Sequence, residues 1–118
     1  MRQDHFFVKV KNVYRRIPVG SIVYLESGGN EVRLVLGNES VIIRGSLVKV
    51  LAMLPEESFC RIHESYGVAV DKIVLFSSES VCMQLRKQRV ELPIGRHHKK
   101  LLEEKIWVLG EKVTTITK

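Results

Sequence analysis

The chain has 118 residues, 45% of them apolar, so it can bury one modest core and is predicted to form a single domain over residues 1–118. A formal net charge of +6 favours an anionic partner, such as nucleic acid or an acidic membrane. The N-terminus lacks the features of a signal peptide, and no run of about 18 apolar residues occurs. We therefore expect a cytoplasmic protein without a membrane partner.

The first half of the chain is predicted to be β-structure. Aromatic and β-branched residues dominate five short segments bounded by turn residues. These predicted strands are residues 6–10, 13–19, 22–26, 32–36 and 41–43. Lys11-Asn12 and Gly37-Asn38 suit hairpin turns. Gly28-Gly29-Asn30 also predicts a hairpin loop, because neither a helix nor a Lys-Ser/Thr pair follows it as a phosphate-binding P-loop requires.

The hydrophobic period changes after Ser46 from that of a strand to that of a helix. Apolar residues recur at positions i, i+3, i+4 and i+7, as Leu47, Val50, Leu51 and Leu54. With Ser46 as N-cap and Pro55 as terminator, the pattern predicts an amphipathic helix of about two and a half turns.

Three more strands follow in the second half, at residues 73–76, 81–85 and 90–94. Lys87-Gln88 is predicted to form a turn between the last two. Cys60 and Cys82 fall in predicted strands and are expected to be reduced, buried, apolar side chains. Residues 107–118 fit an extra strand, an interdomain contact or a frayed end, and the pattern does not decide among them.

A second helix is predicted over residues 95–105, and it begins with five successive basic-type residues, from Arg96 to Lys100. These cations repel one another at the positive end of the helix dipole, so a phosphate group would stabilise them. A solvated charged face is the alternative. His97 and His98 do not predict a metal site, because adjacent helical residues point about 100° apart and no further ligand follows at suitable spacing.

The most varied polar chemistry lies in one block, residues 59–73, and three interpretations are open. His63, Ser65 and Asp71 could imitate a nucleophilic triad, although no nucleophile elbow surrounds Ser65. His63 and Tyr66 could instead be structural, with ring edges bonded to backbone at a strand end. The third interpretation is a turn whose side chains donate to the phosphates of a polyanion. Those side chains are Arg61, His63, Ser65 and Tyr66.

Four motifs together point to a known family. The most specific is Phe59-x-Arg61-Ile62-His63-x-Ser65-Tyr66, and the others are Ile22-Val23-Tyr24-Leu25-Glu26-Ser27, Gly45-Ser46-Leu47 and Leu92-Pro93-Ile94-Gly95-Arg96. In these motifs the sequence resembles the LytTR (LytR/AlgR-type) DNA-binding domain of bacterial response regulators, over residues 6–102. The resemblance implies an all-β, mainly antiparallel, elongated fold of about ten strands with two short helices, in agreement with the strand pattern.

The resemblance also implies that loops, rather than a recognition helix, read successive major grooves of DNA. The corresponding regions are residues 29–31, 63–65 and 95–100. Base contacts are expected from Asn30, Glu31, Glu64 and Arg96. The Arg96 guanidinium suits guanine O6 and N7. Contacts to the DNA backbone are expected from Arg33, His63, Ser65, Lys99 and Lys100.

Three positions depart from the family pattern. Glu64 stands where a basic or amide residue is usual, Ala69 replaces an Asn that could brace the turn, and Gly95 replaces a Ser. The Glu64 carboxylate could accept from cytosine N4 but would repel phosphates. The departures therefore indicate either an unusual DNA site or weak binding.

The leading hypothesis is sequence-specific binding of double-stranded DNA by the output domain of a bacterial response regulator. We expect an excised part of a longer chain with a receiver domain, two copies on paired DNA repeats, and a monomeric isolated domain. The alternative is a protein-interaction module on the same fold with weak or lost DNA binding. The residues offer no coherent catalytic set, so we expect no enzyme, and neither a cofactor nor a metal is expected.

Overall fold

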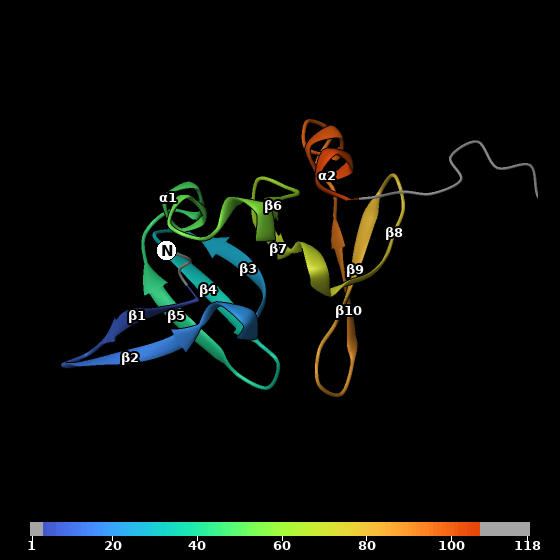
Figure 1. Ribbon diagram of the computed structural model, residues 1–118. Coiled ribbons are helices and arrows are strands. Elements are labelled where there is room, and N and C mark those ends of the chain that lie inside the picture. Colours follow the sequence, from blue (N-terminus) through green and yellow to red (C-terminus); the bar gives the residue numbers. More distant parts are fainter. Residues whose placement is uncertain (1–3, 107–118) are drawn as a thin grey trace, which may run out of the picture.

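The computed structural model describes residues 4–106, so the interpretations of residues 107–118 lie outside the described part of the chain. Within it the chain forms ten strands and two α-helices, which confirms the expected all-β class and strand number (Figure 1). No helix of residues 4–106 is long and apolar enough to cross a membrane.

The strands form three antiparallel sheets. The first is the hairpin β1 (His5–Val10) and β2 (Val13–Pro18). The second has the order β5-β4-β3-β7-β6, with bounds Ser40–Arg44, Glu31–Leu36, Ile22–Gly28, Tyr66–Ala69 and Phe59–Arg61. The third has the order β10-β9-β8, with bounds Arg89–Pro93, Ser80–Gln84 and Ile73–Phe76. Figure 1 shows the sheets side by side, which gives the domain its elongated form.

Two hydrophobic cores lie on opposite faces of the five-stranded sheet. The first contains Leu25 and Leu34 and is covered by the β1–β2 hairpin and by α1 (Leu47–Ala52). The second contains Tyr24 and joins this sheet to β8–β10 and to α2 (Lys99–Lys105), through the fully buried Leu102. Neighbouring residues of a strand point to opposite faces, so the apolar run of β3 can serve both cores.

The predicted hairpin turns are present, with one shift. The Leu36 N–H donates to the carbonyl of Glu39 at 2.8 Å across Gly37-Asn38, as predicted. In the β9–β10 hairpin the Leu85 N–H donates to the carbonyl of Gln88 at 2.8 Å. The central residues of that turn are therefore Arg86-Lys87, one position before the predicted pair, because the register places Gln84 opposite Arg89.

Both helices are shorter than predicted. Ser46 caps α1 as expected, accepting from the Lys49 N–H at 3.2 Å. The helix nevertheless ends at Ala52, because i→i−3 bonds from the next two N–H groups tighten the chain before Pro55. Helix α2 begins at Lys99, after a turn in which the His98 N–H donates to the Gly95 carbonyl at 3.0 Å. The predicted helix start at residue 95 was therefore wrong.

Two smaller expectations also need correction. Residues after Pro18 leave the strand and form a 3-10 turn, Val19–Ser21, in which the Ser21 hydroxyl donates to the Pro18 carbonyl at 2.7 Å. Cys60 is buried, as predicted, but Cys82 is only half-buried. Its side chain lies beside Leu75 and Glu91 in the register of β8–β10, on the face of this sheet away from the core residues Val81 and Met83.

Candidate nucleic-acid interface

Three loops meet on one side of the domain, which we call the contact side: residues 28–31, 62–65 and 94–100. The Ser27 N–H donates to the Ser65 carbonyl at 2.9 Å, and the Gly95 N–H donates to the Ile62 carbonyl at 2.6 Å. These bonds join the β3–β4 loop to the β6–β7 turn, and that turn to the segment before α2. The three regions expected from the sequence are thus adjacent in space.

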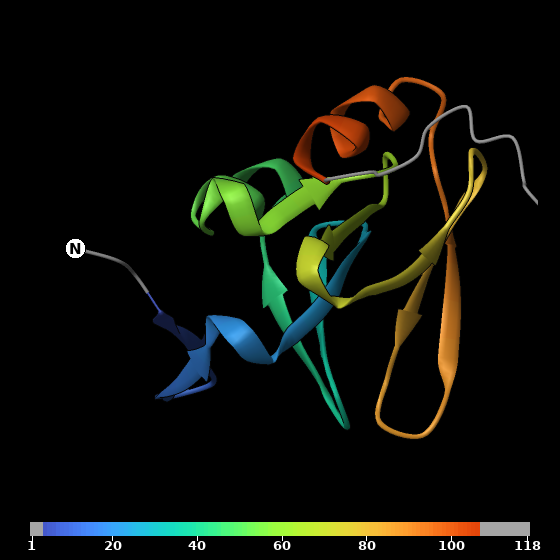
Figure 2. The same cartoon turned by 45° about the vertical axis from the view of Figure 1, so that its right-hand side comes forward.

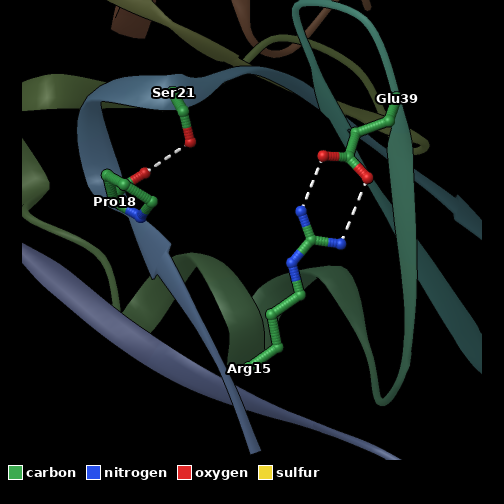
Figure 3. Close-up of polar contacts among 4 residues, drawn as sticks. All are labelled: Arg15, Pro18, Ser21 and Glu39. Atoms are coloured by element: carbon green, nitrogen blue, oxygen red, sulfur yellow. Dashed lines mark hydrogen bonds and ion pairs between the residues drawn. The ribbon is translucent and has the colours of Figure 1, made fainter.

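The opposite end, here called the far side, carries the β4–β5 and β9–β10 turns. Both point away from α1 and α2 (Figures 1 and 2), and the Arg86 N–H donates to the Gly37 carbonyl at 3.2 Å. Glu39 lies here, and both terminal guanidinium nitrogens of Arg15 hold its carboxylate, at 2.6 and 3.1 Å (Figure 3). Pairing with Arg15 lowers the pKa of Glu39.

The side chain of Arg61 donates hydrogen bonds to the backbone of the turn of residues 62–65. Its Nε donates to the His63 carbonyl at 3.1 Å and a terminal nitrogen donates to the Glu64 carbonyl at 2.7 Å. Ser65 donates its N–H to Nδ1 of His63 at 3.0 Å. Two nitrogens of the Arg61 guanidinium therefore hold the shape of the turn.

This geometry separates the three interpretations of the block. The hydrogen bond from Ser65 to His63 uses the backbone N–H and leaves the hydroxyl out, so the arrangement required of a nucleophile is not formed. Tyr66 has a structural contact, since its hydroxyl donates to the Glu26 carboxylate at 3.3 Å and its ring lies 5.6 Å from that of His63. The structural role predicted for Tyr66 thus involves a side chain rather than backbone. Glu64 projects outward, with 81% of its side chain exposed.

The β3–β4 loop is anchored while its tip stays exposed. The Asn30 carbonyl accepts from the Gly45 N–H at 2.9 Å, and Gly29 has a φ of 63°, which glycine adopts without strain. The side chains of Asn30 and Glu31 are exposed. Arg33 lies two residues after Glu31 in β4 and forms an ion pair with Glu26. This pairing raises the pKa of Arg33.

The segment before α2 and the first turn of α2 supply unpaired positive charge. Arg96, Lys99 and Lys100 are exposed and have no ion-pair partner among residues 4–106. His98, by contrast, turns inward: its Nδ1 is buried and has no hydrogen-bond partner in the described chain. Burial, followed by the nearby Arg61 guanidinium, lowers the pKa of His98. The basic run is therefore a turn followed by the start of α2, with exposed cations and one inward ring.

Sequence reasoning missed Glu26 and did not foresee that Arg61 donates to the carbonyls of its own turn. Glu26 was noted only as part of a strand motif, yet it lies opposite Arg33 on one side and Tyr66 on the other. Strand register creates these neighbours, and register between strands distant in sequence is not visible from spacing. Within residues 4–106, no group of three or more His, Cys, Asp or Glu side chains is placed to hold a metal.

An antiparallel β-domain that gathers tethered loops and exposed cations on one side has the architecture of a domain that binds nucleic acid through loops. The chain belongs to the LytTr DNA-binding domain family, whose model matches residues 12–107. A solved structure shares the fold: the LytTr DNA-binding domain of a protein described as a methyl-accepting/DNA response regulator from Bacillus cereus. It aligns with a TM-score of 0.68 and 18% identity, covering 88% of this chain and 97% of that one. The comparison with curated proteins found no match.

Proposed function

We propose that this domain binds double-stranded DNA sequence-specifically, as the output domain of a bacterial response regulator, with its loops in successive major grooves. One observation carries the proposal. The exposed, unpaired cations Arg96, Lys99 and Lys100 lie on the same side as the tethered loops of Asn30 and Glu64. Family membership supports DNA as the anion that they meet.

The side chains divide by chemistry into two groups. Arg96 can offer two parallel donors to guanine, while the exposed Asn30, Glu31 and Glu64 side chains can address other base edges. The second group contacts phosphates, and it consists of Arg33, His63, Ser65, Lys99 and Lys100. Because Nδ1 of His63 accepts the Ser65 N–H, a neutral His63 carries its proton on Nε2 and can donate it to a phosphate oxygen.

The proposed setting is a cytoplasmic regulator with a receiver domain in the parent chain. The isolated domain is monomeric, and two copies bind paired repeats, so that each increases the effective concentration of the other on DNA. No enzymatic step is part of this role.

A second candidate is a protein-interaction module that retains the fold but binds DNA weakly. The exposed Glu64 carboxylate favours it, because its negative charge repels phosphates; its ion-pair partner Arg61 is 3.9 Å away. Salt distinguishes the two functions. A domain that neutralises about six phosphates loses DNA affinity with a log-log slope near −5, whereas an interaction with a protein need not depend on salt in this way.

The deciding experiment is selection of duplexes from a random library, followed by titration of the selected duplex at about 50 and about 200 mM salt. Enrichment of paired repeats with a steep salt slope is expected. A folded domain that enriches no sequence would overturn the proposal in favour of the interaction module.

Three substitutions assign the roles. Arg96→Ala should cost about 1–3 kcal/mol and relax the preference at one base pair, whereas Lys100→Ala should weaken binding to all duplexes alike. Glu64→Lys should strengthen binding to unrelated duplexes. Lys87→Ala is the matched control, because Lys87 is an exposed cation in the β9–β10 turn, which lies on the far side. A uniform loss with Arg96→Ala would make Arg96 a phosphate contact, and an unchanged affinity with Glu64→Lys would place Glu64 away from the groove.

A further inference from the structure

A polar network crosses three strands directly beneath the contact side. Glu26 on β3 lies opposite Arg33 on β4 and opposite Tyr66 on β7. One carboxylate oxygen pairs with the Arg33 guanidinium, and the other accepts from the Tyr66 hydroxyl at 3.3 Å. The Tyr66 ring also lies 6.4 Å from that of Tyr24, which belongs to the second core. Each carboxylate oxygen of Glu26 therefore has a partner, and the ring contact between Tyr66 and Tyr24 connects the network to the second core.

The network lies next to two of the three loops. The residue after Glu26, Ser27, forms the backbone bond to Ser65, and β3 ends at Gly28, where the β3–β4 loop follows. A hollow of about 250 Å³ opens here, and its lining includes Glu26, Arg33 and Glu31. Glu26 is therefore one or two residues away from the groups that hold both loops, so a substitution at Glu26 can change the positions of both.

The ion pair between Arg33 and Glu26 affects how strongly a phosphate can bind here. The Arg33 side chain is 47% exposed and that of Glu26 31%, so a phosphate can approach the pair. A guanidinium has five N–H donors, which leaves several for a second acceptor. Its charge, however, is compensated locally by Glu26. An approaching phosphate therefore gains less from Arg33 than from Lys99 or Lys100, which lack such a partner in the described chain.

We infer that Glu26 is a positioning residue for duplex recognition: it fixes Arg33 and Tyr66 beneath the loops and neutralises Arg33, which limits phosphate binding irrespective of sequence. This inference rests on the proposed function. It identifies Arg33 as an oriented donor with little net charge, and it explains how a basic domain can keep the centre of its contact side selective.

The test is Glu26→Gln, which keeps a hydrogen-bond acceptor of the same size but removes the charge. Arg33 should then act as a full cation and add one phosphate contact. The log-log salt slope should become more negative by about 0.9. This corresponds to an additional loss of affinity of about 3.5-fold between about 50 and about 200 mM salt. The ratio of affinities for selected and unrelated duplexes should fall. Glu26→Gln/Arg33→Gln should return the slope to that of the wild type.

Glu39→Gln is the matched control, since it removes a carboxylate from an equivalent arginine pair on the far side (Figure 3). It should leave the salt slope unchanged. Tyr66→Phe removes the hydroxyl alone and should lower the affinity ratio without changing the slope. A Glu26→Gln domain that is folded and has the wild-type slope and ratio would overturn the inference, as would an equal change in Glu39→Gln.

Should Glu26→Gln alone fail to fold, Glu26→Gln/Arg33→Gln carries the test, because it removes the ion pair without changing the net charge. A neutralised Arg33 predicts that this double variant has a slope close to that of the wild type, whereas Lys100→Ala should reduce the slope by about 0.9. Equal reductions in the two variants would refute the neutralisation of Arg33. Absence of salt-dependent duplex binding by the wild-type domain would instead refute the proposed function itself, so the two failures are distinguishable.

Discussion

Gly95 occupies a crowded position where the segment after β10 meets the turn of residues 62–65. Its N–H donates to the Ile62 carbonyl at 2.6 Å. A Cβ built on Gly95 would lie 2.9 Å from Nδ1 of His98 and 3.4 Å from Cα of His63. The first distance is shorter than a real Cβ contact, so Gly95→Ala must displace the His98 ring.

The expected cost follows from two opposing effects. Forcing a methyl group into an occupied space costs about 1–3 kcal/mol. An alanine also restricts the unfolded chain, which stabilises the domain by about 0.4–1 kcal/mol where the backbone accepts it. The backbone at Gly95 accepts an alanine, because Gly95 does not have a positive φ; within residues 4–106 the glycines that do are Gly29 and Gly45. Gly95→Ala should therefore lower the free energy of unfolding by about 0–2.6 kcal/mol.

The same substitution should have the opposite sign once the histidine is removed. In a His98→Ala background the overpacking disappears, and Gly95→Ala should stabilise the domain by about 0.4–1 kcal/mol. Urea unfolding of the wild type, both single variants and the double variant measures this coupling. Equal effects of Gly95→Ala in the two backgrounds would refute the proposed contact between the two residues.

Two further predictions concern the titrating groups. Burial and Arg61 lower the pKa of His98 below its ordinary value of 6.5, so the unfolded chain binds this proton more readily than the folded domain. The free energy of unfolding should fall as the pH drops below 6.5, and urea titrations should show a smaller fall for His98→Gln; an unchanged pH dependence would contradict the assignment. Burial also raises the pKa of the Cys60 thiol, whereas Cys82 is half-buried. A thiol reagent should label Cys82 first and Cys60 only with denaturant, and Cys82→Ser should abolish the fast phase.

Much of the fold could be predicted from local patterns. Strands and turns follow from alternation and from dipeptides such as Gly37-Asn38, because these depend on neighbours close in sequence. The ends of the helices were less predictable. The i→i−3 bonds that shorten α1 and the turn that delays α2 are responses of the backbone to its packing surroundings, and in α1 the apolar period continued past the end of the helix to Leu54.

The candidate site, like the fold, could be predicted only in part from the sequence. The order of residues in the block from Phe59 onward identified the family and the three loops, since the motif is linear. The partners of individual side chains were not identified. One interpretation had Arg61 donate to phosphates; the tertiary structure shows that it also donates to the carbonyls of His63 and Glu64, which spacing did not indicate.

The sequence by itself therefore determined the class of fold, the positions of the loops and the supply of positive charge, all of which are written in composition and short-range spacing. Only the tertiary structure decided which of those charges remain unpaired. Glu26 and Arg33 are seven residues apart, while Glu26 and Tyr66 are forty apart, and strand register alone makes them neighbours. Register depends on how whole sheets bury their faces, a property of the complete chain rather than of any segment.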